Sequence, residues 1–151
     1  MVKVRASVEI NRPIESVFEF VSNLDNNVRW STGTVEVRKL SEGPWTVGTR
    51  YVYVRQFLGR KMEESGEVTE CDRPTRYAFR SSGAVGGWIF EPVADGTHVT
   101  FSMEVEAEGL FSLGESVVEK MFQGTVADDL DTLKTLLEIP GGPSGVWADE
   151  E

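Results

Sequence analysis

The sequence predicts one α+β domain in which an antiparallel sheet packs against a long C-terminal helix. A length of 151 residues, with 40% hydrophobic and 26% charged residues, is typical of a single globular domain. Between residues 34 and 108, stretches of alternating apolar and polar residues are separated by glycine and proline turns, as in an antiparallel meander. From residue 112 to 138, apolar residues recur at helical spacing. We therefore expect one domain over residues 1–139 and a flexible Gly/Pro-rich tail over 140–151.

The N-terminal region predicts a strand followed by two short helical segments. Residues 2–10, VKVRASVEI, place apolar side chains on one face and polar side chains on the other. Pro13 suits the first position of a helix, and Glu15 suits the positive end of its dipole. Residues 24–33, LDNNVRWSTG, predict a second helical turn or a loop.

The rest of the chain predicts six strands and then the long helix. Turn signals at residues 42–44, 59, 72–74, 83–87 and 95–96 separate the strands. The apolar stripe of the helix consists of Val117, Val118, Met121, Phe122, Val126, Leu130, Leu133 and Leu137. Gly114 and Gly124 lower its helix propensity by about 1 kcal/mol each relative to Ala. One interpretation is that these glycines leave space for a ligand or allow the helix to bend. The other is that the helix starts late, at Gly114, and packs closely at Gly124.

An Asp-Gly turn at residues 95–96 gives the starting register of the sheet. With these two residues at the centre of a type I′ turn, Phe90 lies opposite Phe101 and Trp88 opposite Met103. The strand after the turn alternates so that its phenylalanine and methionine point inward. Trp88 and Phe90 therefore point inward as well.

Two further turns carry this register back along the sheet. A four-residue loop over residues 83–86 pairs Phe79 with Phe90, and a loop over 72–75 pairs Val68 with Phe79. Tyr77 and Phe79 then point inward.

The remaining hairpin places charged side chains on the inward face. An even-length loop at Leu58-Gly59 puts Tyr53 opposite Glu64 and Arg55 diagonal to it, with Tyr51 also inward. A three-residue loop would instead set Glu63 opposite Arg55. Because an inward charge in a solid core costs several kcal/mol, this arrangement favours a cavity or a wet rim.

Composition and charge argue against several classes of protein. A net charge of −10 disfavours binding to nucleic acid or to anionic membranes. The lone Cys71 forms no internal disulfide, and with His98 alone the sequence predicts no zinc site and no other metal or cofactor site. No apolar run is long enough to span a membrane, and the N-terminus alternates instead of forming a signal peptide. We expect a cytoplasmic protein without an integral membrane segment.

The chain resembles the START-like, birch-pollen-allergen-like superfamily (SRPBCC), and within it the polyketide cyclase/dehydrase-like proteins. The resemblance spans almost the whole chain and rests on packing and turn residues, with no catalytic signature among them. These segments are INRPIESVFEFVSN, Arg29-Trp30, Val47 to Thr49, EVTECDRPTRYAFR, DGTHVTF and LDTLKTLLE.

This resemblance implies a helix-grip fold, a curved antiparallel sheet of about seven strands wrapped around the C-terminal helix. An apolar cavity between them would bind lipids, sterols, polyketides or plant hormones. The residues of this sequence expected to bind ligand are Trp30, Tyr51, Tyr53, Arg55, Glu64, Tyr77, Phe79, Trp88, Phe90, Phe101, Met103, Val118, Met121 and Phe122. The alternative is that the aromatic residues form a packed core and that Arg55 and Glu64 are a pair at its wet rim.

Three functions remain open from the sequence. The first is the binding of a hydrophobic or amphipathic small molecule, lipid or polyketide-like. The second is a cyclase or dehydratase in which Tyr53 or Glu64 moves a proton while Arg55 stabilises an enolate or orients a carbonyl. The third is a protein-interaction module with a filled core, and the chain would be a monomer or a homodimer in each case.

Other segments receive a structural or a functional interpretation. Residues 106–116 suit a gate over the cavity or a hydrophobic anchor for the helix. The acidic group Asp128, Asp129 and Asp131 is interpreted as solvated surface, and His98 as an outward residue beside a tight turn. Trp147 in the tail is available to dock elsewhere on the protein.

Overall fold

The predicted α+β architecture is confirmed by the computed structural model, which describes all residues except 58, 107–113 and 141–151. Within the described residues, seven antiparallel strands form one sheet in the order β1-β7-β6-β5-β4-β3-β2. The elements are β1 (Val2–Ile10), α1 (Ile14–Ser22), the 3₁₀ helix η1 (Leu24–Arg29), β2 (Thr34–Lys39), β3 (Arg50–Phe57), β4 (Arg60–Asp72), β5 (Arg76–Ser81), β6 (Ala84–Val93), β7 (Gly96–Val105) and α2 (Glu115–Glu138).

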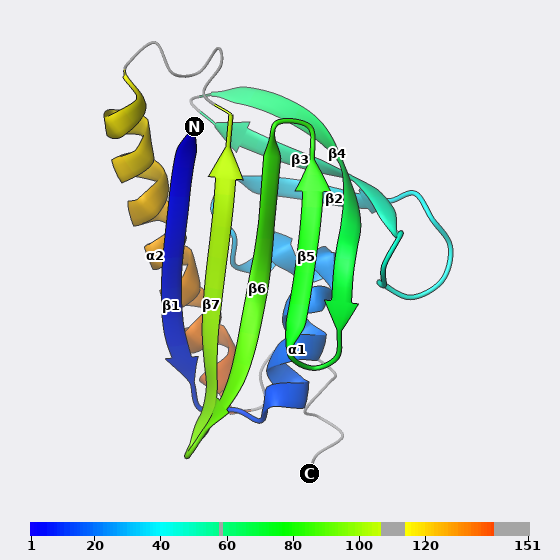
Figure 1. Cartoon of the computed structure of the whole chain (residues 1–151), viewed down its shortest axis with the longest axis vertical. Helices are drawn as coiled ribbons and strands as arrows, with labels where there is room; N and C mark the ends of the chain where they lie inside the picture. The colour runs from blue at the N-terminus through cyan, green and yellow to red at the C-terminus, as the bar shows by residue number, and fades with distance from the viewer. Residues whose placement is uncertain (58, 107–113, 141–151) are drawn as a thin grey trace.

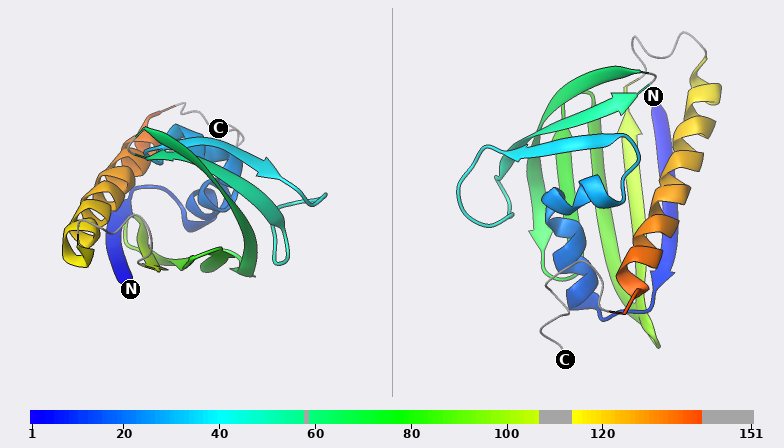
Figure 2. Two further views of the ribbon diagram at one scale, coloured as in Figure 1. Left: turned by 90° about the horizontal axis from the view of Figure 1, so that it is seen from above. Right: turned by 180° about the vertical axis from the view of Figure 1, so that it is seen from behind.

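The sheet is strongly curved, and all three helices lie on its concave face (Figure 2). In the view of Figure 1 they lie behind the strands, with α2 beside β1 at one edge. No helix in the described part of the chain is both long and apolar enough to cross a membrane.

The hairpin between β6 and β7 corrects the predicted register. Val93 pairs with Gly96, so Ala94 and Asp95 form the turn, and Trp88 lies opposite Phe101 instead of Met103. Gly96 is the first residue of β7, and a Cβ there would lie only 2.1 Å from the carbonyl oxygen of Ile10. The glycine therefore serves a close backbone approach and not the turn.

The hairpin between β5 and β6 also differs from the prediction. Ser81 pairs with Ala84, so the loop has two residues instead of four, and Phe79 lies opposite Gly86 instead of Phe90. The Phe79 ring covers Gly86, where a Cβ would lie 2.5 Å from its Cζ atom. Both errors move the register by an even number of residues, so the inward face is the predicted one.

The other two predicted pairings are confirmed. Val68 lies opposite Phe79, and a bulge follows before Glu70. Tyr53 lies opposite Glu64 and Arg55 opposite Met62, so the alternative that set Glu63 against Arg55 is wrong.

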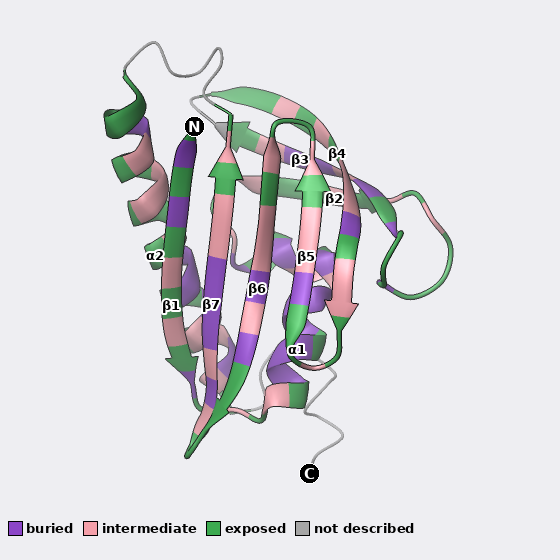
Figure 3. Cartoon of the chain, viewed as in Figure 1, coloured by how far each residue is buried: buried purple, intermediate pink, exposed green. Residues whose placement is uncertain are grey.

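The core fills one end of the concave face. Phe18 of α1 stands edge-on to the rings of Tyr77 and Phe90, at centroid distances of 6.5 and 5.2 Å. Leu133 and Leu137 from the last turns of α2 are fully buried in the same cluster. Figure 3 shows this burial in α1 and in the neighbouring parts of β6 and β7.

Arg73, in the loop between β4 and β5, joins three parts of the chain. Its guanidinium pairs with Glu19 of α1 and donates a hydrogen bond to the carbonyl oxygen of Trp45 at 3.4 Å. It also lies 5.3 Å from the centroid of the Phe18 ring, in cation–π geometry. The loop is thereby fixed against α1 and against the segment before β3.

Polar side chains of α2 occupy the free edge of β1. Four helical residues rise about 6 Å and two strand residues about 6.6 Å, so helix positions 115, 119 and 123 stay in step with residues 1, 3 and 5. The contacts are Met1 N to Glu115 Oε1 (2.9 Å), Lys3 N to Glu119 Oε2 (3.1 Å), Arg5 N to Gln123 Oε1 (3.2 Å) and Gln123 Nε2 to Arg5 O (2.5 Å).

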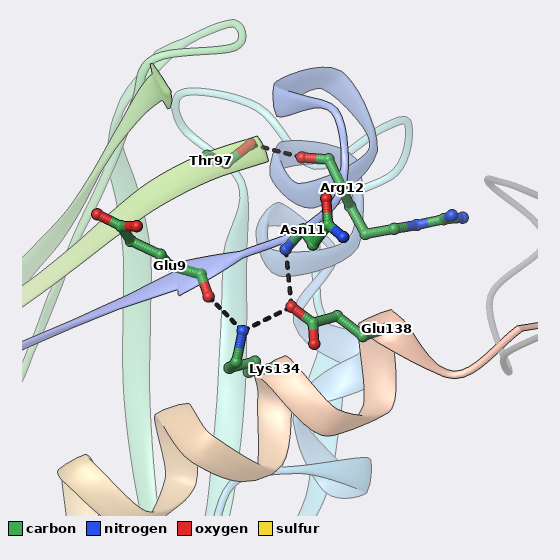
Figure 4. Close-up of polar contacts among 6 residues, drawn as sticks. All are labelled: Glu9, Asn11, Arg12, Thr97, Lys134 and Glu138. Carbon is green, nitrogen blue, oxygen red and sulfur yellow. Dashed lines mark hydrogen bonds and ion pairs between the residues drawn. The ribbon is translucent and has the colours of Figure 1, made fainter. Parts of the chain in front are cut away.

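The last turn of α2 is attached to the end of β1 in the same way (Figure 4). Lys134 Nζ donates to the carbonyl oxygen of Glu9 and to Glu138 Oε2, both at 2.7 Å. Glu138 Oε2 also accepts from the Asn11 backbone N–H at 2.8 Å. Burial would raise the pKa of Glu138, but the hydrogen bonds from Lys134 and Asn11 outweigh it and lower that pKa.

Candidate functional site

Burial falls along the concave face, from a closed end of fully buried residues to an open end of partly exposed ones. Tyr77 of β5 and Phe90 of β6 are fully buried, whereas Phe79, two residues after Tyr77 on β5, and Met103 of β7 are partly exposed. Phe101 lies between the two ends and joins them, since its ring stacks on Phe79 at 6.3 Å and tilts against Trp88 at 4.7 Å. An aromatic wall therefore runs from the fully buried part of the concave face to a partly exposed end.

The predicted ligand-binding residues of the sheet form one cluster with Trp30. Trp30 stands edge-on to Trp88 at 5.7 Å, and Tyr51 contacts Tyr53 at 6.5 Å. The buried members are Trp30, Tyr51, Tyr53, Tyr77, Trp88, Phe90 and Phe101, and the partly exposed members are Phe79 and Met103.

The predicted helix residues lie elsewhere. Val118 is buried in a second cluster with Val2 and Val4, and Phe122 packs against that cluster. Met121 is 39% exposed. The first half of α2 thus packs on β1 and not over the centre of the sheet.

Tyr53, Arg55 and Glu64 do come together at the rim. Arg55 Nε lies 3.0 Å from Glu64 Oε1, and the guanidinium lies 4.7 Å from the centroid of the Tyr53 ring. Arg55 Nε makes no hydrogen bond, so its contact with Glu64 is an ion pair without a directed hydrogen bond. Both side chains are partly exposed, so the pair contributes only about 0–1 kcal/mol and remains available to a polar ligand group.

The hydroxyl of Tyr53 is already engaged. It accepts a hydrogen bond from Asn27 Nδ2 at 3.1 Å and lies 2.8 Å from Thr34 Oγ1. These contacts connect η1, β2 and β3 and fix the buried ring of Tyr53 beneath Arg55. The Tyr53 side chain is therefore held in place by its hydrogen bonds, and Arg55 supplies the positive charge at the rim.

The interpretation of Asp129 as solvated surface is wrong. Asp129 is buried, and both carboxylate oxygens accept the Thr32 backbone N–H at 3.1 Å, while Thr32 Oγ1 donates to Oδ1 at 2.5 Å. Burial raises the pKa of Asp129, and the Thr32 hydrogen bonds and the charge of Arg55 oppose that rise. Its spacing of four residues from Leu133 was the available signal. Asp128 and Asp131 are exposed, as predicted.

Tyr51 and Tyr77 remain neutral at ordinary pH. Burial raises the pKa of Tyr51 and of Tyr77 far above the usual value, and the neighbouring tyrosine adds to each rise. Burial also raises the pKa of the Cys71 thiol. These groups can exchange hydrogen bonds with a ligand, but they are poor bases.

The other residues considered from the sequence are His98, the segment 106–116 and Trp147. His98 Nδ1 lies 3.4 Å from a carboxylate oxygen of Glu9 on the neighbouring strand. Most of the segment 106–116, interpreted as a gate or an anchor, and the tail with Trp147 lie outside the described residues. Among the described residues, no three His, Cys, Asp or Glu side chains are grouped as metal ligands would be.

The structure decides between the two interpretations of Gly114 and Gly124. Gly114 has φ of 100° and immediately precedes α2, which confirms a late helix start. A Cβ on Gly124 would meet nothing within 4 Å, so the prediction of close packing there is wrong.

Comparison with solved structures confirms the fold. The protein TTHA0849 from Thermus thermophilus superposes with a TM-score of 0.73 at 24% identity, over 88% of this chain and 94% of the other. The di-domain ARO/CYC BexL from the BE-7585A biosynthetic pathway superposes with a TM-score of 0.70 at 21% identity. That match covers 93% of this chain but only 48% of BexL, so this chain spans about half of that protein. Ara h 8.0201 gives a TM-score of 0.65 at 12% identity, over 89% and 96% of the two chains.

The family is established by sequence. No curated protein matches the chain. A family model described as polyketide cyclase / dehydrase and lipid transport matches residues 1–138, which confirms the resemblance found in the sequence. The chain belongs to this family of polyketide cyclase, dehydrase and lipid transport proteins.

Proposed function

We propose that the protein binds a hydrophobic or amphipathic small molecule, lipid or polyketide-like, on the concave face between the sheet and α2. The observation that carries this proposal is the aromatic wall, which leaves Phe79 and Met103 partly exposed at its open end. Covering exposed apolar surface stabilises a complex by roughly 2.5 kcal/mol per 100 Å². A carrier needs such a binding surface and no catalytic residue.

An apolar surface connects the wall to the helix at the open end. In the sheet register, Phe79 is followed by Gly86, Met103 and Val4 on neighbouring strands, and Phe122 of α2 packs against the cluster that contains Val4. A flat or elongated apolar molecule lying across these strands would touch β5, β7 and α2 together. Pockets for small molecules usually combine such apolar walls with a few placed polar groups.

The rim supplies the polar group of this proposal. Arg55 is partly exposed and keeps donors free for a carboxylate, phosphate or carbonyl oxygen of the ligand. The amphipathic molecule would lie with its apolar part on the wall and its polar end beside Arg55.

An enzyme of the cyclase or dehydratase type is the second candidate. It is favoured by the positioned trio of Tyr53, Arg55 and Glu64, in which Arg55 could stabilise an enolate oxygen and Glu64 could take up a proton. The family description and the similarity to the di-domain ARO/CYC BexL are consistent with such chemistry. The variant combining Tyr53→Phe, Arg55→Met and Glu64→Gln should abolish turnover in an enzyme but only alter the affinity of a carrier.

Binding is tested by native mass spectrometry of the purified protein, followed by solvent extraction and by titration with 1-anilinonaphthalene-8-sulfonate. Met103→Gln makes the wall polar at nearly constant volume and should weaken dye binding several-fold. Val85→Thr is the matched control, because Val85 is 48% exposed on the outward face of β6. Equal dye affinity in both variants and in the original protein would refute binding at this wall.

A further inference from the structure

Three buried polar atoms near the closed end of the concave face have no hydrogen-bond partner in the protein. They are Asn27 Oδ1, Trp30 Nε1 and Tyr77 Oη. Their residues are 8%, 7% and 0% exposed. A buried polar atom without a partner is costly, so native proteins nearly always provide one from the chain, from water or from a ligand.

The three residues lie around one region between η1 and the sheet. Asn27 is on η1 and Trp30 caps its C-terminal end, where Trp30 N donates to the carbonyl oxygen of Asn27 at 3.3 Å. Asn27 reaches Tyr53 of β3, and Trp30 contacts Trp88 of β6. Tyr77 is on β5, which lies between those two strands and pairs directly with Trp88. Trp88 therefore links Trp30, whose ring it contacts, to Tyr77, with which it pairs in the sheet.

Whichever way the Asn27 amide is oriented, one of its polar atoms is left unpaired. Nδ2 donates to Tyr53 Oη, which leaves Oδ1 without a donor. If the amide were turned over, Oδ1 would accept from the Tyr53 hydroxyl and Nδ2 would be left unpaired. In both orientations one amide atom stays available, beside the indole N–H of Trp30, which only donates.

We propose that Asn27, Trp30 and Tyr77 form a polar subsite at the closed end, selecting ligands whose buried end both accepts and donates hydrogen bonds. A hydroxyl group meets this requirement, and a hydroxyl beside a carbonyl meets it more fully. The indole N–H of Trp30 donates a hydrogen bond to the ligand oxygen, and Asn27 Oδ1 accepts one from the ligand hydroxyl. The Tyr77 hydroxyl can donate or accept. A purely hydrocarbon end leaves all three atoms unpaired.

This inference rests on the proposed function, because the subsite lies deeper along the same aromatic wall. It goes beyond that function in dividing the ligand into two polar ends. One end meets Arg55 at the rim, and the other meets the subsite beneath η1. A simple fatty acyl chain, whose far end is a methyl group, would satisfy the rim alone.

Three probes of nearly equal size test the subsite: 2-naphthol, 2-acetylnaphthalene and 2-methylnaphthalene. The first donates and accepts, the second only accepts, and the third does neither. Their dissociation constants are measured by quenching of tryptophan fluorescence. We expect 2-naphthol to bind most tightly, by about fivefold or more over 2-methylnaphthalene, with 2-acetylnaphthalene between them.

Tyr77→Phe removes one of the unpaired atoms and keeps the ring. It should weaken 2-naphthol several-fold, leave 2-methylnaphthalene unchanged, and leave the melting temperature of the ligand-free protein unchanged or higher. A merely structural hydroxyl would lower the melting temperature and leave the preference between probes intact.

The outcomes separate this inference from the proposed function. If 2-methylnaphthalene and 2-naphthol bind equally well, the wall binds ligands but the subsite does not exist, and a bound water satisfies the three atoms instead. If no probe binds, the proposed function fails, and the subsite with it.

Discussion

Replacing Gly124 with alanine should stabilise this protein. Gly124 is in the interior of α2, and an added Cβ would meet no atom within 4 Å. Glycine costs a helix about 1 kcal/mol relative to alanine because more backbone freedom is lost on folding. Since no contact opposes the added methyl group, Gly124→Ala should raise the free energy of unfolding by about 1 kcal/mol.

In a domain of this size a gain of about 1 kcal/mol corresponds to roughly 2–4 °C in melting temperature. Urea denaturation followed by circular dichroism gives the free energy, and differential scanning calorimetry gives the melting temperature. Gly66→Ala is the opposite control, because its Cβ would lie 2.5 Å from Cζ of the Tyr51 ring and should destabilise the fold by about 1–3 kcal/mol. Loss of stability in Gly124→Ala would show that the helix needs its glycine, for example to bend, and would refute this reasoning.

Two further predictions concern attachments between elements. Arg73→Ala removes an ion pair with Glu19 and a cation–π contact, so it should lower stability by about 1 kcal/mol in urea titrations, with Arg73→Lys recovering only part. An unchanged midpoint would mean that the loop is held without this side chain. Glu138→Gln should lower the melting temperature at pH 7. Because the pKa of Glu138 is lowered from 4.5 on folding, its contribution is present above that pH and is lost as pH falls further, so the difference from the original protein should shrink in acid. A difference that is the same at neutral pH and in acid well below the ordinary carboxyl pKa would contradict the lowered pKa.

The side of the sheet to which each side chain points could be predicted, because side chains in a strand alternate with a period of two. Two turns were placed wrongly, yet Phe79, Trp88 and Phe90 point inward as expected because both errors were even. The turns themselves could not be placed from glycine alone. Gly86 and Gly96 are strand residues that admit a ring or a neighbouring backbone, and that need exists only in three dimensions.

The candidate site was less accessible to sequence reasoning. Opposite charges at diagonal positions on neighbouring strands were enough to predict the pair of Arg55 and Glu64. The placement of α2 was not predictable, because its apolar stripe fits the centre of the sheet as well as the edge strand. Asp129 was interpreted wrongly because its partner Thr32 is distant in sequence, and charge composition alone made it resemble its exposed neighbours.

The contact between α2 and β1 has a consequence for self-association. An edge strand ordinarily offers its unpaired amides and carbonyls to other chains, which invites aggregation. Side chains of α2 occupy such groups of β1 at Lys3, Arg5 and Glu9, so this helix acts as a surrogate strand. In the described part of the protein, growth of the sheet is thereby directed to its opposite edge, β2, where Glu36 and Arg38 carry charges that discourage a chance partner.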